Sequence, residues 1–171
     1  MDQKNPENIC EDQVFKRLFF EQSRSLFNFL YYKCGDQELA EDISQEAFLR
    51  LWKKCRDVPY LKAKSFLFTV ANNLFLDEVK HRKVVRQFEI EFSDTIFSQS
   101  PEFLMEEKEF KQQLTKAIEA LPEKSRIVFL LHRIDKKTYR EIAEMQGISV
   151  KAVEKRMHKA LVELRNLTNK F

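Results

Sequence analysis

Apolar residues recur at helical spacing along most of the chain, in several separate segments. Hydrophobic side chains repeat every three or four positions over about residues 9–33, 37–54 and 65–83, and again after residue 101. This spacing is the period of amphipathic helices. The two glycines, Gly35 and Gly147, both stand where a helical segment would end, and there is no convincing set of strands. The pattern predicts an all-helical protein.

The first helical segment, residues 9–33, has one apolar face. Its members are Val14, Phe15, Leu18, Phe19, Leu26, Phe27, Leu30 and Tyr31. We interpret this face as part of the core and not as a cofactor site, because its spacing is that of a helix packed on its neighbours. Gly35 closes the segment, and Asp36 is positioned to cap the next helix.

The helix expected over 37–54 has two different faces. One is an apolar stripe that must be buried, formed by Leu39, Ala40, Ile43, Ala47 and Leu51. The opposite face carries Asp42, Gln45, Leu49 and Trp52, with Glu46 and Phe48 beside them. A merely solvated face would not need the chain's single tryptophan, whereas aromatic residues beside polar ones are typical of a protein-binding surface. The two carboxylates suggest acid–base chemistry less than partner contacts, because an open helix surface offers no pocket.

A loop is expected over 55–64, since Pro59 interrupts the helical pattern. The following helix, 65–83, ends in a basic cluster made of Lys80, His81, Arg82, Lys83 and, just beyond, Arg86. The adjacent amides Asn72 and Asn73 suit contacts to phosphates or base edges. Cations near a helix C-terminus also favour the helix dipole. The basic end therefore indicates a nucleic-acid contact only if a second segment of the chain also binds nucleic acid.

A second nucleic-acid-binding segment is predicted over residues 138–161, which have the pattern of a helix-turn-helix. Thr138 and Glu141 form a capping box at a helix start, Gly147 ends that helix, and Ser149 can cap the next. The second helix carries an apolar stripe of Val153, Met157, Ala160, Leu161 and Leu164. Its opposite face holds Lys151, Ala152, Lys155, Arg156 and Lys159. A lone basic stripe would more often be a solvated surface, but the capped turn in front of it favours a face that reads a major groove.

Acidic residues mark a boundary between two domains, expected at 9–86 and 110–171. Residues 87–109 contain seven Asp or Glu against one Lys, and they also carry too many apolar residues for a plain tether. This acidic linker is expected to dock somewhere. After it, Ser100 and Pro101 mark a helix to about Leu121, and Pro122 begins another. These two helices would pack beneath the helix-turn-helix.

Composition and the scattered reactive residues exclude several classes of function. Charged residues make up 33% and hydrophobic ones 43% of the chain, and the net charge is +3, as in a soluble globular protein. No apolar leader or membrane-spanning run occurs, so we expect a cytoplasmic protein that does not insert into a membrane. Cys10, Cys34 and Cys55 are widely spaced, and we expect reduced, structural thiols. No catalytic set, cofactor fingerprint or metal-ligand cluster is evident, which argues against an enzyme.

Three segments together resemble bacterial RNA polymerase sigma factors of the extracytoplasmic-function (ECF) group, the minimal two-domain kind. The matching motifs are AEDISQEAFLRLW at 40–52, SFLFTVANNLFLDEVKHRK at 65–83, and LPEKSRIVFLLHRIDKKTYREIAEMQGISVKAVEKRMHKAL at 121–161. They follow the family's order and extend from residue 40 to residue 161. A helix-turn-helix alone is a weak signal because many repressors have one, whereas three matched segments around an acidic linker are a strong one.

The resemblance implies a partner or a nucleic-acid target for each segment. In the family the D-x-x-Q-E helix grips the clamp coiled coil of the polymerase's largest subunit, which maps onto Asp42, Gln45, Glu46, Leu49 and Trp52. The melted minus-10 element of the promoter maps onto the loop 56–64 and onto Asn72, Asn73, Lys80 and Arg82. The helix-turn-helix would read the duplex minus-35 element, and the helices beneath it would meet the flap of the second-largest subunit. The linker would run toward the active-site channel, and an anti-sigma factor, often membrane-anchored, is the family's usual regulator.

Two positions depart from the family pattern. The family often has Trp at the position of Phe66, a change that preserves apolar packing, and Arg at the position of Asn72, where this chain has one charge fewer on the melting surface. The main alternative is a stand-alone helix-turn-helix repressor or activator, which would need a ligand pocket or dimer seam within residues 9–83. A nucleic-acid-processing enzyme would need clustered metal-binding carboxylates, and the sequence has none.

Overall fold

In the parts of the chain that the structure describes, the protein is helical, as its periodicity predicts. The computed structural model describes residues 8–86 and 114–168, with side chains through 81 in the first range and through 166 in the second. The helices are α1 (Asp12–Cys34), α2 (Gln37–Lys53), α3 (Tyr60–Arg86), α5 (Glu123–Arg133), α6 (Tyr139–Gln146) and α7 (Val150–Thr168), and residues 114–119 are also helical. Within these ranges there is no strand. The predicted acidic linker, 87–109, lies outside the described residues.

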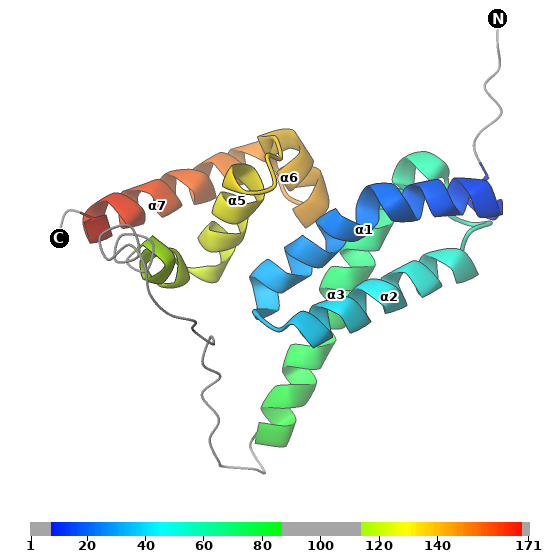
Figure 1. The fold of residues 1–171 in the computed structure, drawn as a ribbon, viewed down its shortest axis with the longest axis horizontal. Coiled ribbons are helices and arrows are strands. Elements are labelled where there is room, and N and C mark those ends of the chain that lie inside the picture. Colours follow the sequence, from blue (N-terminus) through cyan, green and yellow to red (C-terminus); the bar gives the residue numbers. More distant parts are fainter. Residues whose placement is uncertain (1–7, 87–113, 169–171) are drawn as a thin grey trace, which may run out of the picture.

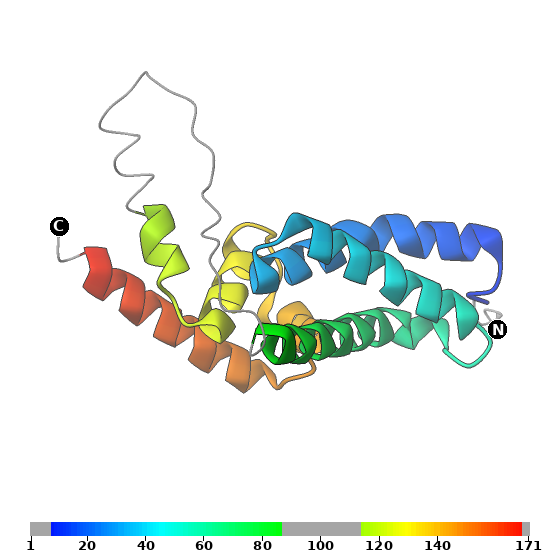
Figure 2. The ribbon, with the colours of Figure 1, turned by 90° about the horizontal axis from the view of Figure 1, so that it is seen from below.

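The N-terminal helices α1, α2 and α3 lie alongside one another (Figure 2). The chain reverses between α1 and α2 at Gly35, whose φ of 67° is the left-handed conformation that glycine adopts without strain. Asp36 then caps α2, because its carboxylate accepts a hydrogen bond from the Leu39 amide at 3.1 Å. The fully buried side chains of this half include Leu26, Leu30, Leu51, Leu67 and Phe68.

The helix α3 begins at Tyr60, so the loop predicted over 55–64 is wrong for its second half. Pro59 stands directly before the helix, and its carbonyl accepts the Lys62 amide at 2.8 Å. Ser65, the expected start, lies inside the helix, where its hydroxyl donates to the Lys62 carbonyl at 3.0 Å. A proline breaks a helix interior but is well tolerated at a helix start. The prediction of a loop assumed that Pro59 breaks a helix, whereas in the structure it precedes a helix start.

The C-terminal helices α5, α6 and α7 pack on one another around Val128, Leu131, Ile142, Val153 and Met157, all buried. A smaller apolar cluster joins the far part of α7 to the chain before α5, and it contains Ala117, Leu121, Ala160 and Leu164. Leu161, predicted to belong to the buried stripe of α7, is instead 38% exposed. It lies beside Ala160 on the helix surface, but the small cluster contacts only the side of α7 that carries Ala160 and Leu164.

A disulfide joins Cys10 to Cys55, which contradicts the prediction of reduced thiols for these two residues. Because the chain reverses between α1 and α2, the residues just before α1 and just after α2 come together, and the two Cα atoms are 5.1 Å apart. The third cysteine, Cys34, donates from its Sγ to the Asp36 carbonyl at 3.2 Å. The sequence spacing of 45 residues gave no sign of the pairing.

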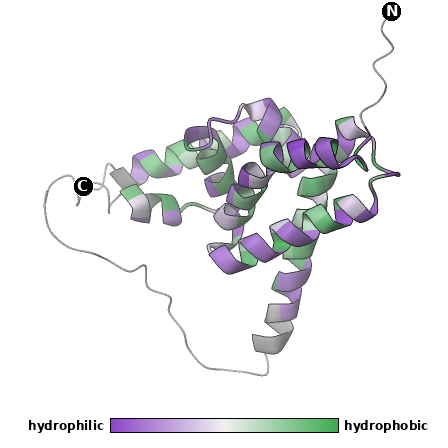
Figure 3. Ribbon diagram, turned by 45° about the vertical axis from the view of Figure 1, so that its right-hand side comes forward, coloured by the Kyte–Doolittle hydropathy of each residue, from purple (hydrophilic) through white to green (hydrophobic). Residues whose placement is uncertain are grey.

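The two helical halves are in contact with each other (Figure 1). α5 packs against α1, and α6 packs against α3. As a result, one continuous hydrophobic cluster includes residues of both halves. Hydrophobic and hydrophilic stretches alternate along the helices, as amphipathic packing requires (Figure 3). Across the described ranges, no helix has the length and apolar character needed to cross a membrane.

Candidate functional site

The predicted polymerase-binding residues share the outward face of α2. Asp42, Gln45, Leu49 and Trp52 are exposed and Glu46 is half-buried, with Leu49 at 53% exposure. The Glu46 carboxylate accepts a hydrogen bond from Arg50 Nε at 2.8 Å, one helical turn away. This bond holds the pKa of Glu46 below its usual value, so the carboxylate stays charged. The face thus combines an exposed leucine and tryptophan with fixed negative charge.

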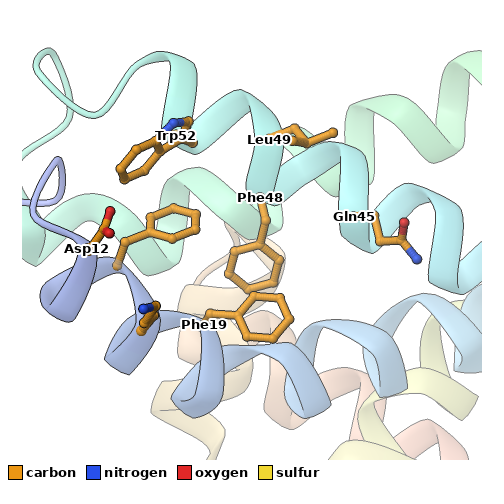
Figure 4. A pocket seen from close by; sticks show the side chains of 8 residues that line it. Asp12, Phe19, Gln45, Phe48, Leu49 and Trp52 are labelled. Atoms are coloured by element: carbon orange, nitrogen blue, oxygen red, sulfur yellow. The ribbon is translucent and has the colours of Figure 1, made fainter.

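Phe48 does not belong to this exposed face, although the sequence placed it there. It is only 4% exposed, and its ring packs against Phe15 and Phe19 of α1 at centroid distances of 6.3 and 4.8 Å. Figure 4 shows Phe48 and Phe19 pointing toward each other from the two helices. The side chain is therefore part of the seam between α1 and α2.

A groove of about 470 Å³ runs between α1 and α2 next to the exposed face. It is lined by Asp12, Phe15, Lys16, Phe19, Gln45, Phe48, Leu49 and Trp52. The contribution of α1 was missed, because Phe15 and Phe19 were both assigned to the core while Phe19 is exposed and Phe15 is half-buried. The signal in the sequence was the number of aromatic residues on α1, which is larger than one buried face can hold. Phe20, next to Phe19, is 78% exposed.

The two asparagines predicted to contact the minus-10 element have different surroundings on α3. Asn73 is exposed and lies on the same helix face as Lys80, seven residues on. Asn72 is half-buried, and its Oδ1 accepts a hydrogen bond from Lys33 Nζ of α1. The Lys33 ammonium also lies over the rings of Phe29 and Phe75. Burial lowers the pKa of Lys33.

The basic end of α3 is only partly described. Lys80 is exposed and lies 3.9 Å from Asp77, one turn earlier on the helix. The side chain of Arg82, the fourth predicted minus-10 residue, lies outside the described residues, and His81 is exposed. Asn73, Lys80 and the short turn before α3 therefore form the accessible part of the predicted surface.

The helix-turn-helix has the capped geometry that its sequence predicts. The Thr138 amide donates to Glu141 Oε2 at 2.8 Å, and the Glu141 amide donates to Thr138 Oγ1 at 3.3 Å. The first of these bonds lowers the pKa of Glu141. Gly147 ends α6 with φ 62°, and the Ser149 hydroxyl accepts the Ala152 amide at 3.2 Å at the start of α7. The capping box, the glycine stop and the second cap are all confirmed.

The predicted basic face of α7 is largely accessible. Lys151, Lys155 and Lys159 are exposed at four-residue intervals, whereas Ala152 and Arg156 are half-buried. The Arg156 guanidinium donates to Gln146 Oε1 of α6 at 2.6 Å. Three lysines on one face can neutralise successive phosphates of a duplex, while Arg156 is already engaged within the protein.

Residues of both predicted DNA surfaces line one pocket between the two halves. This pocket of about 310 Å³ is lined by Phe29, Lys33, Asn72, Leu76, Glu123, Lys124, Ile127, Gln146, Ile148 and Arg156. A second link between the halves lies nearby, where Lys64 of α3 is 3.3 Å from Glu144 of α6. The predicted minus-10 and minus-35 residues therefore come together at Asn72 and Arg156.

Two family models match the chain in sequence. Residues 19–84 match sigma-70 region 2, and residues 111–164 match sigma-70 region 4. The chain is 29% identical over 150 residues to the ECF RNA polymerase sigma factor SigM of Bacillus subtilis, covering 85% of this chain and 89% of that protein. It is 30% identical over 124 residues to the ferric citrate uptake sigma factor FecI of Escherichia coli, covering 71% of this chain and 72% of that protein.

A solved structure has the same fold. It is the sigma factor RpoE from Bartonella quintana, crystallised with the anti-sigma factor NepR, and it matches with a TM-score of 0.63 over 92% of this chain and 98% of that one, at 21% identity. The sequence matches run through both helical halves. The chain therefore belongs to the sigma-70 family, as an ECF RNA polymerase sigma factor that directs transcription initiation.

Proposed function

We propose that this sigma factor binds core polymerase and the two promoter elements through three surfaces, each formed by a different helix. The outward face of α2 binds the clamp coiled coil of core RNA polymerase. α3, with the turn before it, holds the melted minus-10 element, and α7 reads the duplex minus-35 element. In this division, residues 9–86 form region 2, residues 110–171 form region 4, and 87–109 is the linker between them.

The observation that carries the proposal is the exposed apolar surface on α2. Leu49 is 53% exposed beside a groove lined by aromatic rings. Exposed leucine and tryptophan beside a concave apolar surface are typical of residues that anchor a protein partner. A coiled coil presents a convex helical surface to such a groove, and Asp42 and Glu46 supply negative charge on the same outward face of α2.

The minus-10 surface is supported by the accessible side of α3. Asn73 offers an amide to base edges, and Lys80 offers a cation to the backbone of a single strand. The turn before α3, residues 54–59, contains the exposed Arg56. Bases that have left the duplex stack would be held between this turn and the helix. Arg82 extends the same surface in our proposal.

The minus-35 surface is supported by the exposed lysines of α7. The second helix of a helix-turn-helix enters the major groove with its N-terminal residues toward the bases. Lys151 and Lys155 lie in that part of α7, and Ala152 between them is small enough to allow close approach. Lys159 lies one turn further, where it would contact phosphates. The helices beneath, including α5, would contact the polymerase flap.

Transcription with core enzyme tests the proposal directly. The purified chain is mixed with core RNA polymerase and a library of promoter fragments, and the transcripts are sequenced. Initiation at a shared pair of upstream sequences, dependent on this chain, is the expected result. If the chain bound duplex DNA tightly alone and gave no transcripts with core enzyme, a stand-alone repressor or activator would be the better description.

We also propose that an anti-sigma factor regulates this protein. The resemblance to ECF sigma factors implies such a regulator, in many members anchored in a membrane, and the Bartonella quintana relative was crystallised with one. The regulator would cover the surface of α2 that core polymerase uses. A partner that co-purifies with this chain and is displaced by core enzyme would support the proposal, and simultaneous binding of both would contradict it.

A further inference from the structure

The disulfide between Cys10 and Cys55 lies at one end of the groove between α1 and α2. Cys10 stands just before α1, and Cys55 stands just after α2. Both residues are half-buried. Neither is therefore enclosed in the core, where exchange with a thiol in solution would be blocked.

The compartment in which this protein works makes a permanent disulfide unusual. A chain that binds core RNA polymerase and promoter DNA works where both are found, and to this extent the inference rests on the proposed function. In that compartment thiol reductants keep most cysteines reduced, and the disulfides that form are usually transient, in catalytic or redox-sensing sites. Sigma factors are initiation factors and not enzymes, so the pair fits a redox-sensing site better.

The bond anchors the start of α1. At the N-cap position, Glu11 makes no side-chain hydrogen bond to the helix. The amides of Cys10 and Glu11 both donate to Asn8, at 3.1 Å, and these bonds lie within the segment itself. Ile9 is 1% exposed and belongs to the main hydrophobic cluster, against which Cys55 also packs. The disulfide thus adds a covalent link to a helix start that is otherwise held by apolar packing and local hydrogen bonds.

The anchored segment leads directly into the groove. Asp12 and Phe15, on the first turn of α1, line one wall, and Trp52, on the last turn of α2, lines the other. The rings of Phe15 and Trp52 are 4.9 Å apart between centroids, and the Cys55 amide donates to the Trp52 carbonyl at 3.2 Å. Figure 4 shows Asp12 and Trp52 together at one end of the groove and Gln45 at the other. The disulfide therefore holds the two walls together at the end that carries Trp52.

We infer that Cys10 and Cys55 form a reversible redox site that controls the binding of core RNA polymerase. In the oxidised chain the bond keeps the start of α1 against the end of α2, so both walls of the groove are in place for a partner. Reduction frees the start of α1, and the aromatic rings at this end must then be ordered when the partner binds. Such ordering lowers affinity. The oxidised chain is the form that binds polymerase more tightly.

Exchange with a small thiol, such as glutathione, interconverts the two forms. A glutathione thiolate attacks one sulfur of the bond, releases the other cysteine as a thiolate and forms a mixed disulfide. A second glutathione thiolate then displaces the remaining cysteine. The products are two cysteine thiols, which carry the protons of the two glutathione thiols, and one glutathione disulfide, so two electrons pass to the protein. The reverse exchange, with glutathione disulfide as the oxidant, restores the bond.

Thiol counting in glutathione buffers tests the redox site. The full-length chain is equilibrated at different ratios of reduced to oxidised glutathione, quenched with acid and alkylated, and its peptides are analysed by mass. We expect Cys10 and Cys55 to lose and regain their bond together within this range, whereas a purely structural disulfide resists reduction by glutathione. Cys34→Ser should behave as the wild type. A bond that persists in excess reduced glutathione, or that never forms in oxidised glutathione, would overturn the inference.

Competition binding to core RNA polymerase measures the functional consequence. We expect the reduced wild type to bind roughly fivefold to tenfold more weakly than the oxidised wild type, because side chains at the groove must be ordered on binding. Cys10→Ser with Cys55→Ser should have the affinity of the reduced chain in both buffers. Cys34→Ser is the matched control and should respond to reduction as the wild type does. Equal affinities of the oxidised and reduced wild type would contradict the inference.

The chain's single tryptophan separates local loosening from unfolding. Because Trp52 packs against Phe15, acrylamide should quench its fluorescence more strongly in the reduced chain than in the oxidised one. The far-ultraviolet circular dichroism should stay nearly the same. Unchanged quenching would show that the bond does not hold this end of the groove. A large loss of helix on reduction would mean that unfolding, and not the groove, explains a loss of affinity.

These results distinguish the inference from the proposed function. If neither redox form binds core enzyme, the proposed polymerase-binding function fails, and control of that binding fails with it. The thiol counts and the quenching of Trp52 still decide whether the pair is a redox site. If both forms bind core enzyme equally well, the proposed function stands and only the redox control is wrong.

Discussion

At the scale of single residues, Leu49 is the most direct test of the polymerase-binding face. Its side chain is 53% exposed, so Leu49→Lys should leave the fold intact while placing a charge in an apolar contact. We expect the affinity for core RNA polymerase to fall roughly tenfold or more, as at other interface anchors. Competition binding measures the affinity, and the melting temperature should stay within a degree or two of the wild type.

Leu161→Lys is the matched control for this variant. Leu161 is also a partly exposed leucine on a helix, at 38% exposure, but it lies on α7 and away from the face of α2. It should bind core polymerase as the wild type does. Equal losses of affinity in the two variants would mean that a general property, such as charge or solubility, had been changed and that the face of α2 is not specific.

Lys155 tests the DNA face of α7. It is exposed, whereas Arg156 also donates to Gln146, so a change at Arg156 would disturb the fold as well as the DNA contact. If Lys155 contacts a phosphate, Lys155→Ala should lower the affinity of the holoenzyme for the minus-35 duplex. It should also make the slope of log affinity against log salt shallower by about one. Affinity for core polymerase should be unchanged.

The control for Lys155→Ala removes a positive charge elsewhere in the same half. Lys116 is exposed and lies in the helical stretch before α5. Lys116→Ala should leave the salt slope unaltered. A slope that changes equally in both variants would show that net charge, and not the position of Lys155, governs DNA binding. Loss of core binding in Lys155→Ala would show that the DNA face has been placed on the wrong surface.

At the scale of helices, the unambiguous local signals gave correct predictions, whereas one ambiguous local signal and the contacts between distant residues did not. The capping box of Thr138 and Glu141 and the left-handed Gly147 depend on residues within one turn, so the sequence predicts them. The start of α3 was misplaced because proline is compatible with either a break or a helix start. Phe48 and Phe19 were misplaced because the helical period separates two faces but does not say how far a neighbouring helix covers each.

The pairing of Cys10 with Cys55 could not be predicted from the sequence, because it depends on how α1 and α2 pack against each other. It links the start of α1 to the end of α2 across 45 residues. A closed loop of that length should stabilise the fold by about 2–4 kcal/mol, mainly by restricting the unfolded chain. We expect a reductant to lower the free energy of unfolding of the wild type by that amount.

A double variant supplies the reference for this measurement. Cys10→Ser with Cys55→Ser cannot form the bond, so its stability should match that of the reduced wild type and should not respond to reductant. Urea unfolding followed by circular dichroism gives the free energies, and alkylation with mass analysis counts the thiols. Two alkylated thiols at Cys10 and Cys55 in the untreated protein, with no effect of reductant on stability, would contradict the disulfide.

At the scale of the whole molecule, the two halves share a hydrophobic core. The sequence predicted two domains with a linker, and the family models match each half separately, yet one hydrophobic cluster includes Leu30 of α1 together with Val128 and Ile142. No local pattern in the sequence indicates this packing, because it joins faces that are each also compatible with solvent or a partner. Free wild-type protein should therefore unfold in a single transition, with calorimetric and van't Hoff enthalpies equal.

Opening the molecule should divide that transition. The Asn28 amide of α1 donates to Asp135 Oδ1, in the turn after α5, at 2.8 Å. Asn28→Asp places a second carboxylate there, so the two halves should separate. The smaller C-terminal half, with α5, α6 and α7, should then unfold at a lower temperature than the disulfide-linked N-terminal half. Differential scanning calorimetry would then show two peaks, and the exchange with Asp135→Asn should restore one. Two separate transitions in the wild type would mean that its halves fold independently. In that case the packing of α5 and α6 on α1 and α3 is too weak to couple the unfolding of the two halves.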